Sequence, residues 1–158
     1  MPRKATKALV RPKLPDRKYE SEMVQRLINR VMQNGKKQMA ERLVYDGMEL
    51  AAKKVKNENA LEVFDKAFKN ITPFVETRSR RVGGANYQIP FEVKGQRQKH
   101  LAIMWFVAAA RAKKGVPMAE RIANELADAY NQTGTSFKKK EDTHKMAESN
   151  RAFAHFAR

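Results

Sequence analysis

Three arginines and two glycines stand together in the stretch RSRRVGG, from Arg78 to Gly84. A guanidinium group donates paired hydrogen bonds to a phosphate and also stacks on an unpaired base, so such a cluster suits contact with a nucleic acid. The alternative interpretation is a solvated turn. Because attraction to phosphates does not report the sugar, the arginines alone leave both RNA and DNA open.

The charge surplus of the chain is large and unevenly distributed. Among 158 residues, 33 lysines and arginines face 17 aspartates and glutamates, which gives a formal net charge of +16. Residues 1–20, 76–100 and 138–158 carry net charges of +5, +4 and +3, whereas the other 92 residues share +4. Self-repulsion of this size destabilises a compact state unless an anionic partner or counterions offset it. The sequence therefore predicts a basic arm, a basic internal segment and a basic tail that contact an anion.

Residue patterns for catalysis are missing from the sequence. The chain has no cysteine, and its histidines (His100, His144 and His155) lack the spacing of metal ligands, so they are interpreted as surface or phosphate-facing side chains. Neither a nucleophile motif nor a glycine-rich phosphate loop with its lysine occurs. We therefore expect no enzyme, no metal and no cofactor; an RNA-modifying enzyme would need a cofactor-binding loop that the sequence does not contain.

The composition also bears on where the protein resides. No apolar run approaches the roughly 20 residues of a membrane span. The first 20 residues, MPRKATKALVRPKLPDRKYE, lack the apolar centre of a secretory signal. Together with the lack of cysteine, these features predict a soluble protein of the cell interior that has no membrane partner.

The elements that position the arginines are expected to be mainly helical, because apolar residues recur at helical spacing along most of the chain. Three helices are predicted within residues 21–71, where Ser21 is a plausible N-cap and Pro73 prevents continuation. Three more are predicted within 96–156, and their starts are expected near Arg97, Pro117 and Phe137.

The start of the last helix matters for its charge. The preceding helix is expected to end at Gly134 and the last to run from about Phe137 into the 150s, which places the run KKK at 138–140 in its first turn. The positive end of the helix dipole disfavours cations there, so three lysines in that turn would favour a nearby anion.

Between the two groups of helices the apolar period changes from 3.6 to 2. Apolar and polar residues alternate from 86 to 93, which predicts a strand, and Pro90 favours an edge position. A partner strand is expected from about Phe74 to Arg80, with Gly83 and Gly84 supplying the positive φ of the turn. This predicts a two-stranded β-hairpin over residues 73–93 that has an apolar base and a basic tip.

The expected fold class is mainly α, in a single domain over residues 1–158. It consists of a bundle of about six helices, a protruding two-stranded β-hairpin and an extended basic N-terminal arm over residues 1–20. Prolines at positions 2, 12 and 15, many cations and little apolar periodicity predict that this arm orders only against a partner.

Seven segments in collinear order resemble the small-subunit ribosomal protein seven family of bacteria and organelles. They are MPRK at the start, LPDRKYESE at 14–22, NGKKQMAE at 34–41, VETRSRRVGGANYQIPFEV at 75–93, AAARAKKG at 108–115, RIANELADA at 121–129 and FKKKEDTHKMAESNRAFAHF at 137–156. The stretches RSRRVGG and AFAHF are the most specific of these.

The resemblance implies a structural constituent of the small ribosomal subunit that binds the 3′ major domain of small-subunit rRNA and nucleates assembly of the head. Such proteins lie at the subunit interface near the tRNA exit site and the mRNA exit path. The implied partners are rRNA, the nearby exit-site tRNA and mRNA, and small-subunit proteins nine and eleven, with no homo-oligomer expected. The implied location is the cytoplasmic ribosome, or the matrix or stroma if the protein serves an organelle.

The resemblance also implies which side chains contact RNA. Contacts with rRNA are expected from Arg3, Lys4, Arg11, Lys36, Lys37, Arg78, Arg80, Arg81, Arg97, Arg111, Lys113, Lys138 and Lys139. The tRNA and mRNA are expected near Arg80, Arg81, Gly83 and Gly84. The rival interpretation is a free-standing nucleic-acid binder, such as a packaging protein or an RNA chaperone.

Overall fold

The computed structural model describes residues 14–157, so the predicted arm contacts Arg3, Lys4 and Arg11 lie outside the described residues. The described part is mainly helical and contains one two-stranded antiparallel sheet. Its elements are α1 (Glu22–Val31), α2 (Lys37–Val55), α3 (Ala60–Ile71), β1 (Val75–Val82), β2 (Ala85–Glu92), α4 (Gln96–Ala112), α5 (Met118–Tyr130), α6 (Gly134–Ser149) and the 3₁₀ helix η2 (Arg151–Ala157). None of the helices within residues 14–157 combines the length and the apolar character that crossing a membrane requires.

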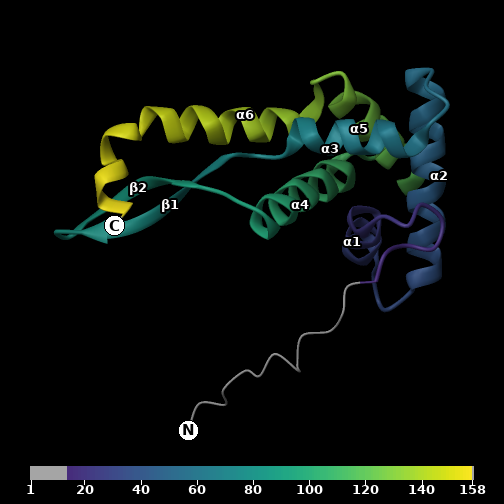
Figure 1. Ribbon diagram of the computed structural model, residues 1–158, viewed down its shortest axis with the longest axis horizontal. Helices are drawn as coiled ribbons and strands as arrows, with labels where there is room; N and C mark the ends of the chain where they lie inside the picture. The colour runs from purple at the N-terminus through teal and green to yellow at the C-terminus, as the bar shows by residue number, and fades with distance from the viewer. Residues whose placement is uncertain (1–13, 158) are drawn as a thin grey trace, which may run out of the picture.

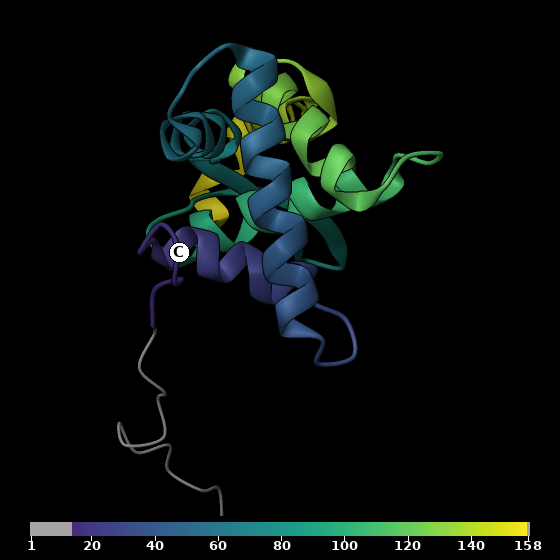
Figure 2. The same cartoon turned by 90° about the vertical axis from the view of Figure 1, so that its right-hand side faces the viewer.

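Helices α1 to α5 bury their apolar stripes in one shared core. Helix α2 runs across the ends of α3 and α5, and α4 lies beneath α3 (Figures 1 and 2). The rings of Phe64, Phe68 and Phe106 form a chain through this core, with centroids 4.4 and 5.1 Å apart. All three rings are buried, and each contributes about 1.5–3 kcal/mol through the area removed from water.

A glycine sets the distance between α2 and α5. A Cβ atom on Gly47 would lie 2.7 Å from the Cγ2 atom of Ile122 and 3.0 Å from the carbonyl oxygen of Ala119. Real Cβ atoms do not approach other atoms so closely, so the two helices pack at this separation because position 47 has no side chain.

Several predicted helix ends are confirmed. Ser21 is the N-cap of α1, and its side chain accepts a hydrogen bond from the backbone N–H of Val24. The third helix ends at Ile71, directly before Thr72 and Pro73. The β-hairpin is confirmed as well, because β1 pairs with β2 in antiparallel register from Val75 opposite Glu92 to Val82 opposite Ala85.

The turn of the hairpin is the predicted glycine pair. Gly83 and Gly84 have φ angles of +58° and +92°, the combination that a two-residue turn between twisted strands requires. The base of the ribbon is anchored by Ile89 and Val93, which are buried. Beyond this base the ribbon extends away from α1 to α5, with α6 and η2 alongside it, as Figure 1 shows.

Two expectations about the C-terminal third are wrong. Helix α5 ends at Tyr130 rather than Gly134, and α6 begins at Gly134 rather than Phe137. The cause is Ser136, whose backbone N–H and hydroxyl both donate to the buried carboxylate of Glu125 and so hold the first turn of α6 in place. The lysines at 138–140 consequently lie in the second turn, where the argument from the helix dipole does not apply.

The last helix also ends earlier than predicted. Helix α6 ends at Ser149, and the amide of Asn150 donates to the carbonyl oxygen of Met146, which competes with continuation of the helix. The chain then changes direction and continues as η2, which lies against β2.

A buried carboxylate holds the segment before α1 in place. Asp16 accepts hydrogen bonds from the backbone N–H groups of Lys18, Tyr19 and Ser21 and from the hydroxyl of Tyr45. Burial alone would raise the pKa of Asp16, but these donors outweigh it and lower the pKa below the ordinary value.

Substitution of Gly47 by valine is expected to lower the free energy of unfolding by about 1–3 kcal/mol, because the new side chain collides with α5. Asp46→Val is the matched control, since Asp46 is an exposed neighbour on the same helix. Urea unfolding measures both variants. Equal midpoints for the two would contradict the close packing of α2 on α5.

Substitution of Asp16 by asparagine is expected to lower the free energy of unfolding at pH 7 by about 1–3 kcal/mol, because the donors lose a charged acceptor. A lowered pKa stabilises the fold above the ordinary carboxyl value of about 4 and ceases to do so as the pH falls through the lowered pKa. The difference between wild type and Asp16→Asn should therefore narrow in urea unfolding series as the pH falls below the ordinary carboxyl pKa of about 4. Asp46→Asn, at an exposed carboxylate, serves as control; a gap that stays constant with pH would refute the assignment.

Candidate nucleic-acid interface

Two of the predicted RNA contacts share one carboxylate at the base of the hairpin. The Nε atom of Arg78 lies 2.6 Å from Oε1 of Glu76, and Nη2 of Arg97 lies 2.9 Å from Oε2. The side chain of Glu76 is only 8% exposed. Burial alone would raise its pKa, but the two arginines outweigh burial and lower it. This triad joins β1 to α4 and offsets part of the charge of both arginines.

The remaining two arginines of the hairpin lie on opposite faces. Arg80 pairs with Tyr87 in the register, and its Nη1 atom donates to the carbonyl oxygen of Phe156 at 2.9 Å. Arg81 pairs with Asn86 on the other face, is exposed, and has no hydrogen bond or ion pair within residues 14–157. The described part of the hairpin therefore presents Arg81 as its freely available guanidinium group.

A second basic site lies where α1, α2, α4 and α5 meet. A groove of about 350 Å³ is lined by apolar side chains, among them Met39 and Met118, and by the cations Lys36, Arg111 and Arg121. Lys36 is the N-cap residue of α2, so the fold unites it with an arginine from the last turn of α4. The structure thus brings together two predicted contacts, Lys36 and Arg111, that are far apart in the sequence.

The cations of this groove differ in how firmly they are held. Arg111 donates to the carbonyl oxygen of Arg30 at 3.3 Å, near the end of α1. Arg121 donates from Nε to the carbonyl oxygen of Val116 at 2.6 Å. Lys37 next to the groove lies 3.8 Å from Glu41, one turn along α2, and its side chain stays half exposed.

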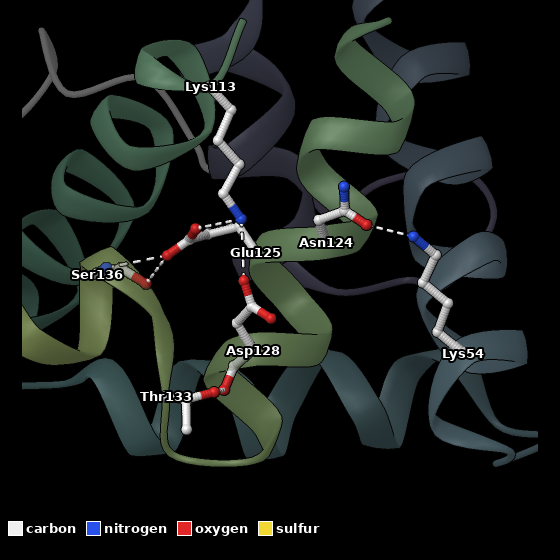
Figure 3. A network of polar contacts seen from close by, with 7 residues as sticks. All are labelled: Lys54, Lys113, Asn124, Glu125, Asp128, Thr133 and Ser136. Carbon is white, nitrogen blue, oxygen red and sulfur yellow. Dashed lines mark hydrogen bonds and ion pairs between the residues drawn. The ribbon is translucent and has the colours of Figure 1, made fainter. Parts of the chain in front are cut away.

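Lys113 is partly buried, and its ammonium group is paired with carboxylates rather than free at the surface. Figure 3 shows its ammonium group between Glu125 and Asp128, at 2.9 and 3.0 Å. Burial alone would lower the pKa of Lys113, but the two carboxylates outweigh burial and raise it. Since Glu125 also accepts the two hydrogen bonds from Ser136, this cluster joins the end of α4, helix α5 and the start of α6.

The lysine run of α6 divides in the same way. Lys138 and Lys139 are exposed, as an interface requires. The third lysine, Lys140, is half buried, and its Nζ atom donates to the carbonyl oxygen of Asn70 at 2.6 Å. Burial lowers the pKa of Lys140. Lys140 therefore joins α6 to the end of α3, while its two neighbours remain available.

The residues missed by the sequence interpretation are those that hold the basic side chains in place. Glu125 carries a signal, because it lies on the apolar face of its helix, three residues after Ile122 and four before Ala129. A carboxylate in such a stripe indicates a buried ion pair. Arg121 lies within one of the matching segments but was not singled out.

The histidines differ from their interpretation in one case. His144 accepts a hydrogen bond at Nε2 from the backbone N–H of Phe74, and this bond connects α6 to the residue directly before β1. Burial, and secondarily the charge of Lys140, lowers the pKa of His144. Among residues 14–157 no group of three histidine, aspartate or glutamate side chains has the geometry to hold a metal ion.

Comparison with known proteins matches the chain over almost its whole length. The family model described as ribosomal protein S7p/S5e matches residues 2–151. Small ribosomal subunit protein uS7 of Chloroflexus aggregans is 54% identical over 148 residues, which cover 94% of each chain. The protein of the same name from Thermosipho melanesiensis is 54% identical over 150 residues, covering 95% of this chain and 96% of the relative. That from Borrelia turicatae is 49% identical over 141 residues, covering 89% and 90%.

These matches extend over the hairpin, the groove and the lysine run of α6. They agree with the basic two-stranded ribbon. The chain belongs to the ribosomal protein S7p/S5e family.

Proposed function

We propose that this protein binds the 3′ major domain of small-subunit rRNA directly and nucleates assembly of the head of the small subunit. Membership of the family makes the chain a structural constituent of the small ribosomal subunit and not an enzyme. The observation that carries the proposal is the separation of two kinds of cation. Arg78, Arg97 and Lys113 are held by carboxylates, whereas Arg81, Lys138 and Lys139 are exposed and have no carboxylate partner within residues 14–157.

The mechanism follows from this separation. Each exposed cation that meets an RNA phosphate releases a counterion into solution, so binding is driven by salt-dependent entropy. The helical body supplies a fixed shape, because its core is packed before RNA is bound. RNA that folds around this shape loses conformational entropy, and its contacts with the rigid protein offset that loss. A protein without catalytic groups can promote assembly in this way.

The groove near Lys36 and Arg111 and the hairpin tip divide the proposed contacts. The groove lies in the helical body, and the tip projects from it (Figure 1). We assign Lys36, Lys37 and Arg111 to rRNA at the body, together with the arm residues Arg3, Lys4 and Arg11. The tip, with Arg81, Gly83 and Gly84, is assigned to the neighbourhood of the exit-site tRNA and the mRNA path.

The proposed protein neighbours are small-subunit proteins nine and eleven.

Lys113 is left out of the proposed RNA interface, because two carboxylates already hold its ammonium group. Arg78 and Arg97 are assigned both to holding the base of the hairpin and to contacting RNA, since each side chain is about half exposed while it contacts Glu76.

The rival function, a free-standing nucleic-acid binder, makes a different prediction in the cell. A stable constituent sediments with small subunits through a gradient at high salt, whereas a loosely held binder is washed off, because its contacts are phosphate contacts alone. Recovery of the protein only at the top of such a gradient would support the rival.

Replacing Arg81 with alanine is expected to weaken binding to a 3′-major-domain rRNA fragment and to reduce the slope of log K against log salt by about one. The fold should be unchanged, because the Arg81 side chain has no hydrogen bond or ion pair within residues 14–157. Lys53→Ala is the matched control, since Lys53 is an exposed cation of α2 far from the hairpin along the chain. An unchanged slope for Arg81→Ala would remove the hairpin from the interface.

Replacing Lys113 with methionine is expected to lower the free energy of unfolding by about 1–3 kcal/mol, because Glu125 is left buried without its cation. The salt slope of rRNA binding should stay at the wild-type value. Lys114→Met is the control at an exposed neighbour and should leave the stability unchanged. A reduced slope with unchanged stability would show that Lys113 contacts RNA instead.

A further inference from the structure

The outer half of the hairpin lacks the support that its base receives. The base is held by the burial of Ile89 and by the triad of Glu76 with Arg78 and Arg97. Farther out, the exposed residues from 83 to 86 have no third strand beside them, because the sheet consists of β1 and β2 alone within residues 14–157. An isolated two-stranded ribbon is at best marginally stable in water, so its direction has to be fixed by another element.

Helix η2 is that element. After α6 ends, the chain turns back and η2 comes to lie on the ribbon, near the C-terminus marked in Figure 1. The rings of Phe153 and Phe156 lie 5.1 and 5.6 Å from the ring of Tyr87 on β2, measured between centroids. The three rings are half buried. Aromatic pairs at this separation stabilise a contact beyond the area that they bury.

A polar contact reinforces the aromatic one on the same face. Arg80 lies opposite Tyr87 in the register, and it donates to the carbonyl oxygen of Phe156 at 2.9 Å. Helix η2 therefore contacts Arg80 on β1 and Tyr87 on β2. Both belong to one face of the ribbon, and Arg81 and Asn86 on the opposite face remain exposed.

We propose that η2 is a clamp that fixes the direction of the hairpin before RNA is bound, with Phe153 and Phe156 as positioning residues for Arg81. This inference rests on the proposed function, because it concerns how the ribbon presents a cation to RNA. It also divides the arginines: Arg78 anchors the base, Arg80 joins the ribbon to the clamp, and Arg81 contacts the nucleic acid.

The clamp acts through preorganisation. A ribbon that swings freely must be immobilised when it binds, and the lost freedom reduces affinity without removing any phosphate contact. Loss of the clamp should therefore lower affinity at every salt concentration and leave the salt slope unchanged. Loss of Arg81 should instead change the slope, so the two effects can be told apart.

The test uses spin-label distance measurements on the full chain. The protein has no cysteine, so Ala85→Cys near the turn and Asp142→Cys on α6 give one defined pair of labels. Both positions are exposed. The distance distribution should be narrow in the otherwise wild-type protein and broad in the double variant Phe153→Ala with Phe156→Ala. The variant with tyrosine at both positions keeps the rings and should restore the narrow distribution.

Binding of the same variants to the 3′-major-domain rRNA fragment supplies the second readout. The alanine pair should bind about threefold to tenfold more weakly than wild type with an unchanged salt slope, and the tyrosine pair should bind as wild type does. Circular dichroism and thermal unfolding check that the helical core is intact. Tyr87→Ala removes the same contact from the side of the ribbon and should broaden the distribution equally.

Two results would overturn the clamp. One is a distance distribution that is the same in the alanine pair as in the wild type, or broad in both. The other is a broadened distribution with unchanged RNA affinity, which would deny η2 any part in positioning. Failure of the wild-type protein to bind the fragment would instead count against the proposed function, because the distance measurement on the free protein stands independently of RNA.

Discussion

The surplus of positive charge is the constraint on which the rest of the structure depends. A chain with a net charge of +16 folds only if its cations are kept apart or paired wherever they approach the core. The pairing is visible at two places. Glu76, 8% exposed, lies between Arg78 and Arg97, and Glu125, fully buried, lies against Lys113. Removing Glu76 would leave Arg78 and Arg97 without the carboxylate that lies between them, and removing Glu125 would leave Lys113 with Asp128 alone.

The same pairing determines what the protein offers to a partner. The carboxylates offset the charge of the cations that they contact and also fasten parts of the fold to one another, since Glu76 joins the hairpin to α4 and Glu125 joins α5 to the start of α6. Arg81, Lys138 and Lys139 have no such partner within residues 14–157 and are exposed. A rigid body that presents exposed cations is the arrangement that a shape template for folded RNA requires, and it needs no catalytic group.

The sequence predicted the helices and the hairpin because their signals are local. The N-cap Ser21, the Thr72–Pro73 stop and the glycine pair of the turn act within a few residues, and all three lie where expected. The start of α6 was not predictable in this way. It depends on Ser136 reaching a carboxylate eleven residues earlier in the chain, and an interaction between separate helices leaves no periodic trace.

The site was predicted as a set of cations but not as an arrangement. The family resemblance implied RNA contacts at Arg78, Arg97 and Lys113, but nothing local showed that Arg97 and Lys113 each face a carboxylate from another element of the fold. The C-terminal aromatics were visible in the stretch AFAHF, yet their partner Tyr87 lies on the hairpin, far away in sequence. The contact of these aromatic side chains with the hairpin is therefore visible only in the tertiary structure.

Hydrogen exchange of the full chain with and without the 3′-major-domain rRNA fragment tests most directly that RNA contacts the margins of a preformed body. The account predicts slower exchange on binding at residues 80–86, around Lys36 and Lys37, and along the exposed face of α6. Exchange in the buried parts of α2 and α5 should be unchanged, because these helices are fully packed beforehand. Protection centred on the end of α2 near Lys53 and Lys56, with residues 80–86 unaffected, would contradict the account.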